Sequence, residues 1–166
     1  CIPTKFLLNA ADRLQDIQNI SKIGIDYKNV SVNWNRIIGS RDEIVNMHEK
    51  GVQHIIRSNK VALYNGSARI NEFVYNKNLI EIRESSSTTI IESKNIIIAV
   101  GSRARREFIG IQISGSRLLN SDDILSIKNI PKSLVIIGGG VVGCEFASIF
   151  SRFLTKITII ESTERL

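Results

Sequence analysis

The chain has few of the residues that ligate metal ions. Its two cysteines are Cys1 and Cys144, and its two histidines are His48 and His54, among 166 residues. None of them stands at a metal-ligand spacing. We therefore expect no bound metal, and we place both histidines on the surface of a polar helical stretch.

Long apolar runs and clustered charge are also missing. No apolar stretch reaches the roughly 20 residues of a membrane-spanning helix. The net charge is +6, but Lys and Arg are scattered. The tight cluster Arg103, Arg105 and Arg106 has no aromatic residues interleaved with it, which argues against nucleic-acid binding. We expect a cytoplasmic protein, or a mitochondrial matrix protein if the source is eukaryotic, with neither a membrane nor a nucleic acid as partner.

What the sequence does contain is a glycine-rich segment between two apolar runs. Residues 134–137 form a short β-branched run, typical of a buried parallel strand. Residues 141–154 then repeat apolar side chains at helical intervals, and residues 157–160 form a second buried run. The order predicts a strand, a glycine turn, a helix and a second strand.

Three glycines and one acid give this segment the pattern of a dinucleotide site. Gly138 permits a tight turn, Gly140 lets a pyrophosphate approach the backbone, and Gly143 lets the helix lie close to the sheet. Glu161 ends the second run, where a carboxylate accepts hydrogen bonds from a ribose diol and repels a 2′-phosphate. The spacing therefore predicts an NAD site.

Other groups at the start of the helix complete this prediction. Its free N–H groups and the helix dipole favour an anion, so Gly139, Val141 and Val142 join the predicted NAD-binding residues. The alternative is a glycine-rich turn without a ligand. It would have to tolerate three glycines where alanine is more stable by about 0.5–1 kcal/mol each.

The first residues of the chain place a cysteine directly before a predicted helix. Pro3 restricts the backbone there, and the helical pattern begins at Phe6. The helix dipole and Lys5, within one turn, both favour the thiolate form of Cys1. Cys1 is thus a candidate redox or nucleophilic cysteine, although these residues alone support an unremarkable cysteine equally well.

Between these two segments the pattern changes from helical to extended. Residues 31–56 predict one or two polar helices interrupted at Gly51. From residue 61 onward, short apolar runs alternate with polar turns, including a turn at Asn65-Gly66. We expect a small antiparallel insertion that returns to a buried strand at residues 96–100.

The next part of the chain is charged and irregular. Residues 103–115 predict a linker, and we place a domain boundary near residues 107–119. Ser121 is predicted to cap a short helix over residues 122–127.

Four segments resemble, in order, motifs of the pyridine nucleotide–disulfide oxidoreductases. Residues 1–8, Cys-Ile-Pro-Thr-Lys-Phe-Leu-Leu, resemble the redox-active segment. Residues 59–69 resemble the segment near the adenine of FAD, and residues 95–102, Asn-Ile-Ile-Ile-Ala-Val-Gly-Ser, resemble the strand that follows. Residues 130–145 resemble the NAD-binding motif. The likeness covers essentially the whole chain.

The resemblance implies an α/β fold, as part of a flavoprotein with two dinucleotide-binding domains, for FAD and NAD, and a small antiparallel β insertion. Residues 1–110 would form the C-terminal part of the FAD-binding domain, with the redox-active cysteine helix, the insertion and the closing strand. Residues 111–166 would form the N-terminal part of the NAD-binding domain. We expect the sequence to be a piece of a longer protein, inactive alone.

The resemblance also implies roles for individual residues. Cys1 would be the flavin-proximal cysteine of a Cys-x4-Cys pair, and Lys5 would lie beside the flavin and pair with Glu145. From the residues alone, Glu145 could equally be a helix-start carboxylate that interacts with the helix dipole. Ala68 would contact the adenine.

The FAD site would also include Val100, Gly101 and Ser102. Two positions depart from the family pattern. Val100 replaces the usual Thr, and Leu154 stands where a helix-ending Gly is usual, so we expect a costly left-handed backbone there.

The sequence of residues 1–8 most resembles that of the branch of the family that oxidises dihydrolipoamide. We therefore expect electrons to pass from dihydrolipoamide, or a lipoyl-bearing protein, through the disulfide and FAD to NAD, in a homodimer. Two alternatives remain: a mercuric or glutathione-type reductase of the same family, and a nucleotide-binding module without activity.

Overall fold

The computed structural model describes residues 1–74, 77–108 and 110–164. Within these ranges the chain combines helices with parallel and antiparallel strands, which confirms the predicted α/β class. No helix in the described ranges is long and apolar enough to cross a membrane.

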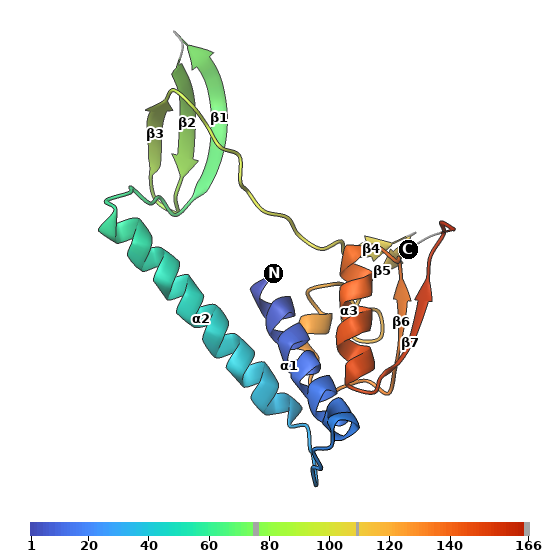
Figure 1. Cartoon of the computed structure of the whole chain (residues 1–166). Helices are drawn as coiled ribbons and strands as arrows, with labels where there is room; N and C mark the ends of the chain where they lie inside the picture. The colour runs from blue at the N-terminus through green and yellow to red at the C-terminus, as the bar shows by residue number, and fades with distance from the viewer. Residues whose placement is uncertain (75–76, 109, 165–166) are drawn as a thin grey trace. The chain divides into compact units, whose positions relative to one another are not determined.

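The chain divides into two compact units, whose elements are labelled in Figure 1. The first unit comprises Cys1–Glu49 and Ala104–Leu166, and the second comprises Lys50–Arg103. The segment that begins with Cys1 and the segment with the glycine turn therefore share one unit, although residues 9–129 lie between them in the sequence.

The glycine-rich segment has the predicted order of strand, turn, helix and strand. β6 (Ser133–Ile137) and β7 (Lys156–Ile160) pair in parallel, with Leu134 opposite Ile157. α3 (Val141–Arg152) connects the two strands. Parallel neighbours need such a crossover, because a tight turn can join only antiparallel strands.

The core of the first unit lies where α1, α3 and the start of α2 meet. α1 spans Ile2–Asn19 and continues as a short 3-10 helix, η1 (Ile20–Ile23), and α2 spans Trp34–Ser58. The Trp34 ring meets the edge of Phe153, with centroids 5.4 Å apart. The buried apolar side chains of this cluster are Leu7, Ala11, Trp34, Ile124, Phe146, Ile149, Phe150 and Phe153.

Polar contacts anchor the first turns of α2. The indole N–H of Trp34 donates to the Ile127 carbonyl at 2.9 Å, and the buried Arg41 guanidinium donates to the Leu125 carbonyl. The helix then continues through Gly51, so the predicted interruption is wrong. A glycine inside a helix costs about 1 kcal/mol relative to alanine, which weakens a helix but does not end it.

The segment before β6 is more regular than a linker. β4 (Glu107–Phe108) and β5 (Ile111–Gln112) form a short antiparallel pair, and η2 (Ile124–Ser126) is a 3-10 turn. The prediction that Ser121 caps a helix over residues 122–127 is wrong, and η2 has no side-chain cap. The Asn120 side chain holds the turn before η2, because its Oδ1 accepts the backbone N–H groups of the next two aspartates at 3.0 Å.

The second unit contains the expected antiparallel insertion. β1 (Ser67–Val74), β2 (Lys77–Arg83) and β3 (Thr88–Ser93) form a sheet in that order, with a register shift between Ile70 and Glu72. A serine-rich turn, residues 84–87, connects the last two strands. The connection between β1 and β2 includes residues that lie outside the described ranges.

The predicted turn at Asn65-Gly66 does not join two strands. Residues 61–66 are not in a strand, and β1 begins directly after them. A Cβ on Gly66 would lie 2.5 Å from the Arg83 carbonyl oxygen. This glycine is therefore required because two backbone segments approach closely at the start of β1, rather than for a two-residue turn.

The predicted buried strand at residues 96–100 is also absent from the structure. Ile97 and Val100 are 91% and 88% exposed, and neither is in a strand. A buried parallel strand needs hydrogen-bonding neighbours, and the described part of the second unit supplies only the antiparallel sheet. The apolar pattern alone could not create those neighbours.

The end of α3 confirms the expected left-handed residue. Leu154 has φ +65°, and its N–H donates to the Ser151 carbonyl at 3.0 Å. The next N–H, from Thr155, donates to the Phe150 carbonyl, also at 3.0 Å. This pair of bonds is a Schellman motif, which ordinarily uses Gly at the left-handed position.

Replacing Leu154 by glycine should stabilise the first unit. The left-handed conformation costs a non-Gly residue about 1–2 kcal/mol, whereas glycine loses about 0.5–1 kcal/mol through its greater freedom in the unfolded chain. Leu154 is 79% exposed and loses little packing. We expect a net gain of about 0.5–1 kcal/mol in denaturant unfolding. Leu154→Ala keeps the strained backbone, so an equal gain from alanine would contradict this cause.

Candidate functional site

The glycine turn between β6 and α3 has the geometry of an open cradle. Gly138 has φ +104° and donates its N–H to the Ile160 carbonyl at 2.8 Å. A Cβ on Gly143 would lie 2.2 Å from the Gly138 carbonyl oxygen, so only glycine lets the helix pack this closely. A Cβ on Gly140 would meet no atom within 4 Å. The space beside Gly140 is therefore free for a ligand.

The start of α3 offers its backbone to that space. Gly140 is the N-cap residue, and no side chain caps the helix. Val141 is 83% exposed at the first helical position, and Val142 beside it is also exposed. Unsatisfied N–H groups at a helix start, together with the helix dipole, form an anion-binding site.

Glu161 closes the cradle from the end of β7. Its Oε2 accepts the Gly139 N–H at 2.6 Å, and its Oε1 accepts the N–H groups of Ser162 and Thr163 at 2.7 and 3.0 Å. These bonds, led by the one from Gly139, lower the pKa of Glu161 from 4.5 to about 2. The carboxylate is thus ionised throughout the neutral range.

An apolar cavity of about 630 Å³ lies against this turn in the first unit. One wall is β6 and the first turns of α3, and the other wall is the segment from Ala104 to Ile124. Gly138, Gly140 and Gly143 all line it. A cavity of this size with glycine backbone and a helix start at its edge is a suitable place for a small ligand.

The predicted partners Lys5 and Glu145 form an ion pair between α1 and α3. The Lys5 side chain is 62% exposed and that of Glu145 is 23% exposed. One turn before Lys5, Cys1 is the N-cap residue of α1 and carries a free, exposed thiol. The ion pair therefore links the cysteine helix to the helix of the glycine turn.

A second contact between the same helices lies further along both of them. Arg152 approaches Asp12 with 3.2 Å between Nε and Oδ1, and it also donates to the Gln15 side chain at 2.7 Å. Residue numbers increase together along the two helices in these contacts, so α1 and α3 run in the same direction. Their N-termini, with Cys1 and Gly140, lie toward the same end of the pair.

Four of the residues predicted to line an FAD site lie in the second unit. Ala68 is on β1, paired with Ile82 of β2. Val100, Gly101 and Ser102 follow the insertion as exposed residues without strand structure, and Gly101 has φ +70°. The structure thus groups the predicted NAD residues, Cys1, Lys5 and Glu145 in one unit and these four residues in the other.

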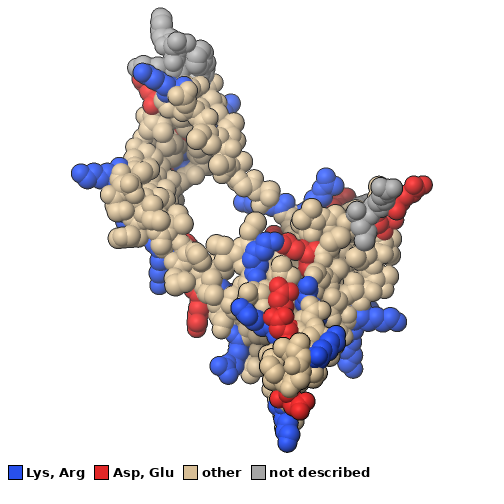
Figure 2. All heavy atoms as spheres, in the orientation of Figure 1, with Lys and Arg blue, Asp and Glu red and all other residues tan. Residues whose placement is uncertain are grey.

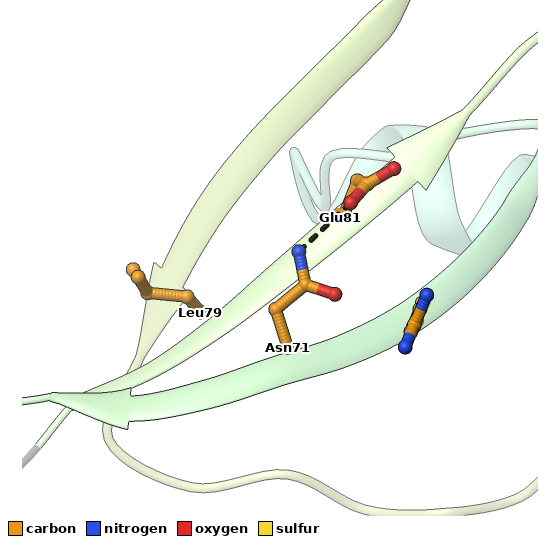
Figure 3. Close-up of a pocket in the computed structure, with 4 residues that line it drawn as sticks. Asn71, Leu79 and Glu81 are labelled. Carbon is orange, nitrogen blue, oxygen red and sulfur yellow. Dashed lines mark hydrogen bonds between the residues drawn. The ribbon is translucent and has the colours of Figure 1, made fainter.

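The antiparallel sheet carries a polar hollow of about 410 Å³, which no sequence pattern predicted. Asn71 donates to Glu81 at 2.8 Å across the strands, and Leu79 lies beside them (Figure 3). The bonds from Asn71 and Arg83 lower the pKa of Glu81. The polar side chains around the hollow hydrogen-bond to one another, and we assign no ligand to it.

Two other polar features were missed by the sequence patterns. The Asn120 backbone N–H donates to Asp123 at 3.2 Å, and Arg106 donates to the same carboxylate at 2.9 Å; these two bonds lower the pKa of Asp123. Cys144 is half-buried, and its Sγ–H donates to the Gly139 carbonyl at 3.1 Å. The sequence signal for this contact is that Cys144 lies four residues after Gly140, the N-cap residue of α3.

Charged side chains are mixed by sign on the face shown in Figure 2. Lys and Arg side chains are spread over this face, with Asp and Glu side chains among them. Within the described part of the chain, no three His, Cys, Asp or Glu side chains form a group that could hold a metal ion.

Comparison with known proteins assigns this arrangement to a family. The family model described as pyridine nucleotide-disulphide oxidoreductase matches residues 1–166. The chain belongs to this family. The family resemblance noted in four sequence motifs is therefore confirmed over the whole chain.

Two curated members of the family illustrate the likeness. A dihydrolipoyl dehydrogenase of Bacillus subtilis is 36% identical over 168 residues, which is 100% of this chain and 36% of that protein. A dihydrolipoyl dehydrogenase of Chlamydia trachomatis is 34% identical, covering 100% of this chain and 35% of that protein. The chain thus spans about a third of the length of these relatives.

Solved structures of the family share the fold. LpdA from Mycobacterium tuberculosis matches with a TM-score of 0.86 at 17% identity, covering 99% of this chain and 36% of that chain. The HOCl-induced flavoprotein disulfide reductase RclA from Escherichia coli matches with a TM-score of 0.68 at 26% identity, covering 99% of this chain and 33% of that chain.

Proposed function

We propose that this chain is part of a dihydrolipoyl dehydrogenase-type enzyme, which oxidises dihydrolipoamide and reduces NAD. Membership of the disulphide oxidoreductase family and the identity to curated dihydrolipoyl dehydrogenases support this activity. The observation that carries the proposal is the ion pair between Lys5 and Glu145, since it joins the cysteine helix to the glycine-turn helix.

The residues present fit a bound NAD. The open space beside Gly140 admits a pyrophosphate, and the start of α3 supplies N–H donors to it. Glu161 would hold the adenosine ribose through its carboxylate, while its low pKa keeps a full negative charge where NADP has a phosphate. We therefore propose NAD rather than NADP as the nucleotide.

In this proposal Cys1 would be the flavin-proximal member of a Cys-x4-Cys disulfide in the complete protein. The substrate dithiol would reduce that disulfide by thiol–disulfide exchange and would itself become a disulfide. FAD, when bound, supplies the two-electron carrier between the thiols and NAD. Lys5 would lie beside the flavin, and its ion pair with Glu145 would hold it in place. Residues 1–110, including Ala68, Val100, Gly101 and Ser102, would belong to the FAD-binding domain, and residues 111–166 to the NAD-binding domain.

For the complete protein we propose a cytoplasmic homodimer, or one in the mitochondrial matrix if the source is eukaryotic. Its partner is dihydrolipoamide or a lipoyl-bearing protein.

An assay of the complete protein with FAD tests both the reaction and the nucleotide. We expect dihydrolipoamide to reduce NAD much faster than NADP. Glu161→Gln keeps an acceptor for the Gly139 N–H but removes the charge, so the preference for NAD should fall by at least about tenfold. Like charges about 4 Å apart repel by about 4 kcal/mol near a protein surface.

Two outcomes would contradict the proposal in different ways. Absence of NAD reduction, with glutathione disulfide or mercuric ion turned over instead, would move the protein to another branch of the family. Equal rates with NAD and NADP in the unmodified protein would remove the role given to Glu161 and leave the rest of the site standing.

A further inference from the structure

Gly139, the middle residue of the glycine turn, is held by a side chain on each of its two peptide groups. Its N–H donates to Glu161 Oε2 at 2.6 Å. Its carbonyl accepts the thiol of Cys144 at 3.1 Å. The two side chains come from different elements, the end of β7 and the second turn of α3, so the residue is fixed from both sides.

Cys144 makes a second bond to the same turn. Its backbone N–H donates to the Gly140 carbonyl at 3.0 Å, as the first regular bond of the helix. The thiol bond is one residue further back, at Gly139. The carbonyl groups of Gly139 and Gly140 are therefore both directed toward α3. Because the C=O and the following N–H of a trans peptide group point in opposite directions, the N–H groups that follow these two carbonyls are directed away from α3.

The turn needs such contacts because its own residues do not restrict it. Gly138, Gly139 and Gly140 are consecutive, and glycine accesses both signs of φ at little cost. The peptide groups flanking Gly139 can rotate unless hydrogen bonds hold them. The helix-start N–H groups can bind a phosphate well only if they are already oriented, since ordering them during binding costs affinity.

The place of Cys144 on α3 also argues against a simple packing role. The buried side chains of this helix are Phe146, Ile149 and Phe150, whereas Cys144 is half-buried. A thiol is a weak donor, but no other side chain on the described part of α3 is recorded as bonding to the turn.

We propose that Cys144 is a positioning residue for NAD: its thiol holds the Gly139 carbonyl so that the N–H groups after it face the pyrophosphate. The inference rests on the proposed NAD-binding function. Cys144 contacts no substrate atom in this scheme. It acts by holding Gly139, which the carboxylate of Glu161 holds from the other side.

The test compares two variants of Cys144 in the complete protein. Cys144→Ala removes the donor, and Cys144→Ser restores a donor of similar size. Loss of one ordinary hydrogen bond corresponds to a factor of about two to ten in a binding constant. We therefore expect alanine to raise the dissociation constant for NAD by about two- to tenfold, and serine to return it to within about twofold.

A second measurement reports on the turn itself. Amide hydrogen exchange at Gly139, followed without NAD, should be faster in Cys144→Ala than in the unmodified protein and should be slowed again in Cys144→Ser. The matched control is Ser151→Ala, which removes a hydroxyl bond to the Ser148 carbonyl at 3.1 Å on the same helix. This control should change neither NAD binding nor Gly139 exchange.

The outcomes separate this inference from the proposed function. If the unmodified protein binds NAD, and Cys144→Ala binds it equally with unchanged Gly139 exchange, the positioning role is wrong and the function stands. If alanine and serine weaken binding alike, the effect is one of shape and the hydrogen-bond role is also wrong. If the unmodified protein does not bind NAD, the proposed function fails and the inference fails with it.

Discussion

Replacing Gly143 by alanine should lower the stability of the first unit substantially. The new Cβ would lie 2.2 Å from the Gly138 carbonyl oxygen and 3.2 Å from Ile136 Cγ2. The carbonyl is backbone and cannot move aside without shifting either β6 or α3. Overpacking of this kind costs about 1–3 kcal/mol and occasionally more. We expect a marked fall in the denaturant midpoint, together with loss of NAD binding, since the helix start would move.

Gly140→Ala, compared with Gly143→Ala, separates an effect on NAD binding from an effect on stability. A Cβ on Gly140 meets no atom within 4 Å, and its backbone, with φ −69° and ψ 178°, suits any residue. Stability should therefore change by no more than about 0.5 kcal/mol. The added methyl group occupies the space through which a pyrophosphate would approach, so NAD affinity should still fall strongly.

Unfolding curves and NAD titrations of the complete protein distinguish the two roles. Gly39→Ala, in α2 and with open space at its Cβ, is the control and should leave both quantities unchanged or slightly raise stability. A stable Gly143→Ala protein with normal NAD binding would show that the close packing is dispensable. A Gly140→Ala protein that binds NAD normally would place the pyrophosphate elsewhere.

The Lys5–Glu145 pair should couple strongly in the rate at which NADH reduces the bound flavin. Lys5 is largely exposed, so the pair contributes only about 0–1 kcal/mol to stability. We expect the ion pair to affect the rate because it holds the N-termini of α1 and α3 in position relative to each other. In a double-mutant cycle of Lys5→Met and Glu145→Gln, we expect a coupling energy on the order of 0.5–3 kcal/mol in that rate.

The second contact between α1 and α3 supplies a matched control. Arg152 and Asp12 join the same helices but lie away from the helix starts. A cycle of Asp12→Asn and Arg152→Met should therefore reduce stability while leaving the rate of flavin reduction nearly unchanged. Additive effects of the Lys5 and Glu145 variants, within about 0.3–0.5 kcal/mol, would mean that this ion pair is structural only.

The segment from β6 to Glu161 could be predicted almost completely from the sequence. Its two strands, its helix and its glycine turn are consecutive, so each element is recognisable from its own hydrophobic period and from the glycines between them. The left-handed Leu154 was predicted from the family resemblance, because a helix-ending Gly is usual at this position. The roles of these residues in binding NAD remain predictions.

Elements that depend on distant neighbours were predicted less well. Residues 96–100 have the composition of a buried strand, but the described part of their unit offers them no parallel partner. Gly66 has the sequence of a hairpin turn, yet it is the nearby Arg83 backbone that requires a glycine. In both cases the same local pattern fits two environments, and only the surrounding chain selects one.

By itself, the sequence determined the family, the order of elements around the glycine turn, and the residue types that a dinucleotide site needs. Tertiary structure decided which of those residues meet. It placed Lys5 against Glu145 across 140 residues, and it turned the Cys144 thiol toward Gly139 rather than into the core. Local periodicity depends on neighbours within a few residues, whereas these contacts depend on how whole helices pack, which no local pattern encodes.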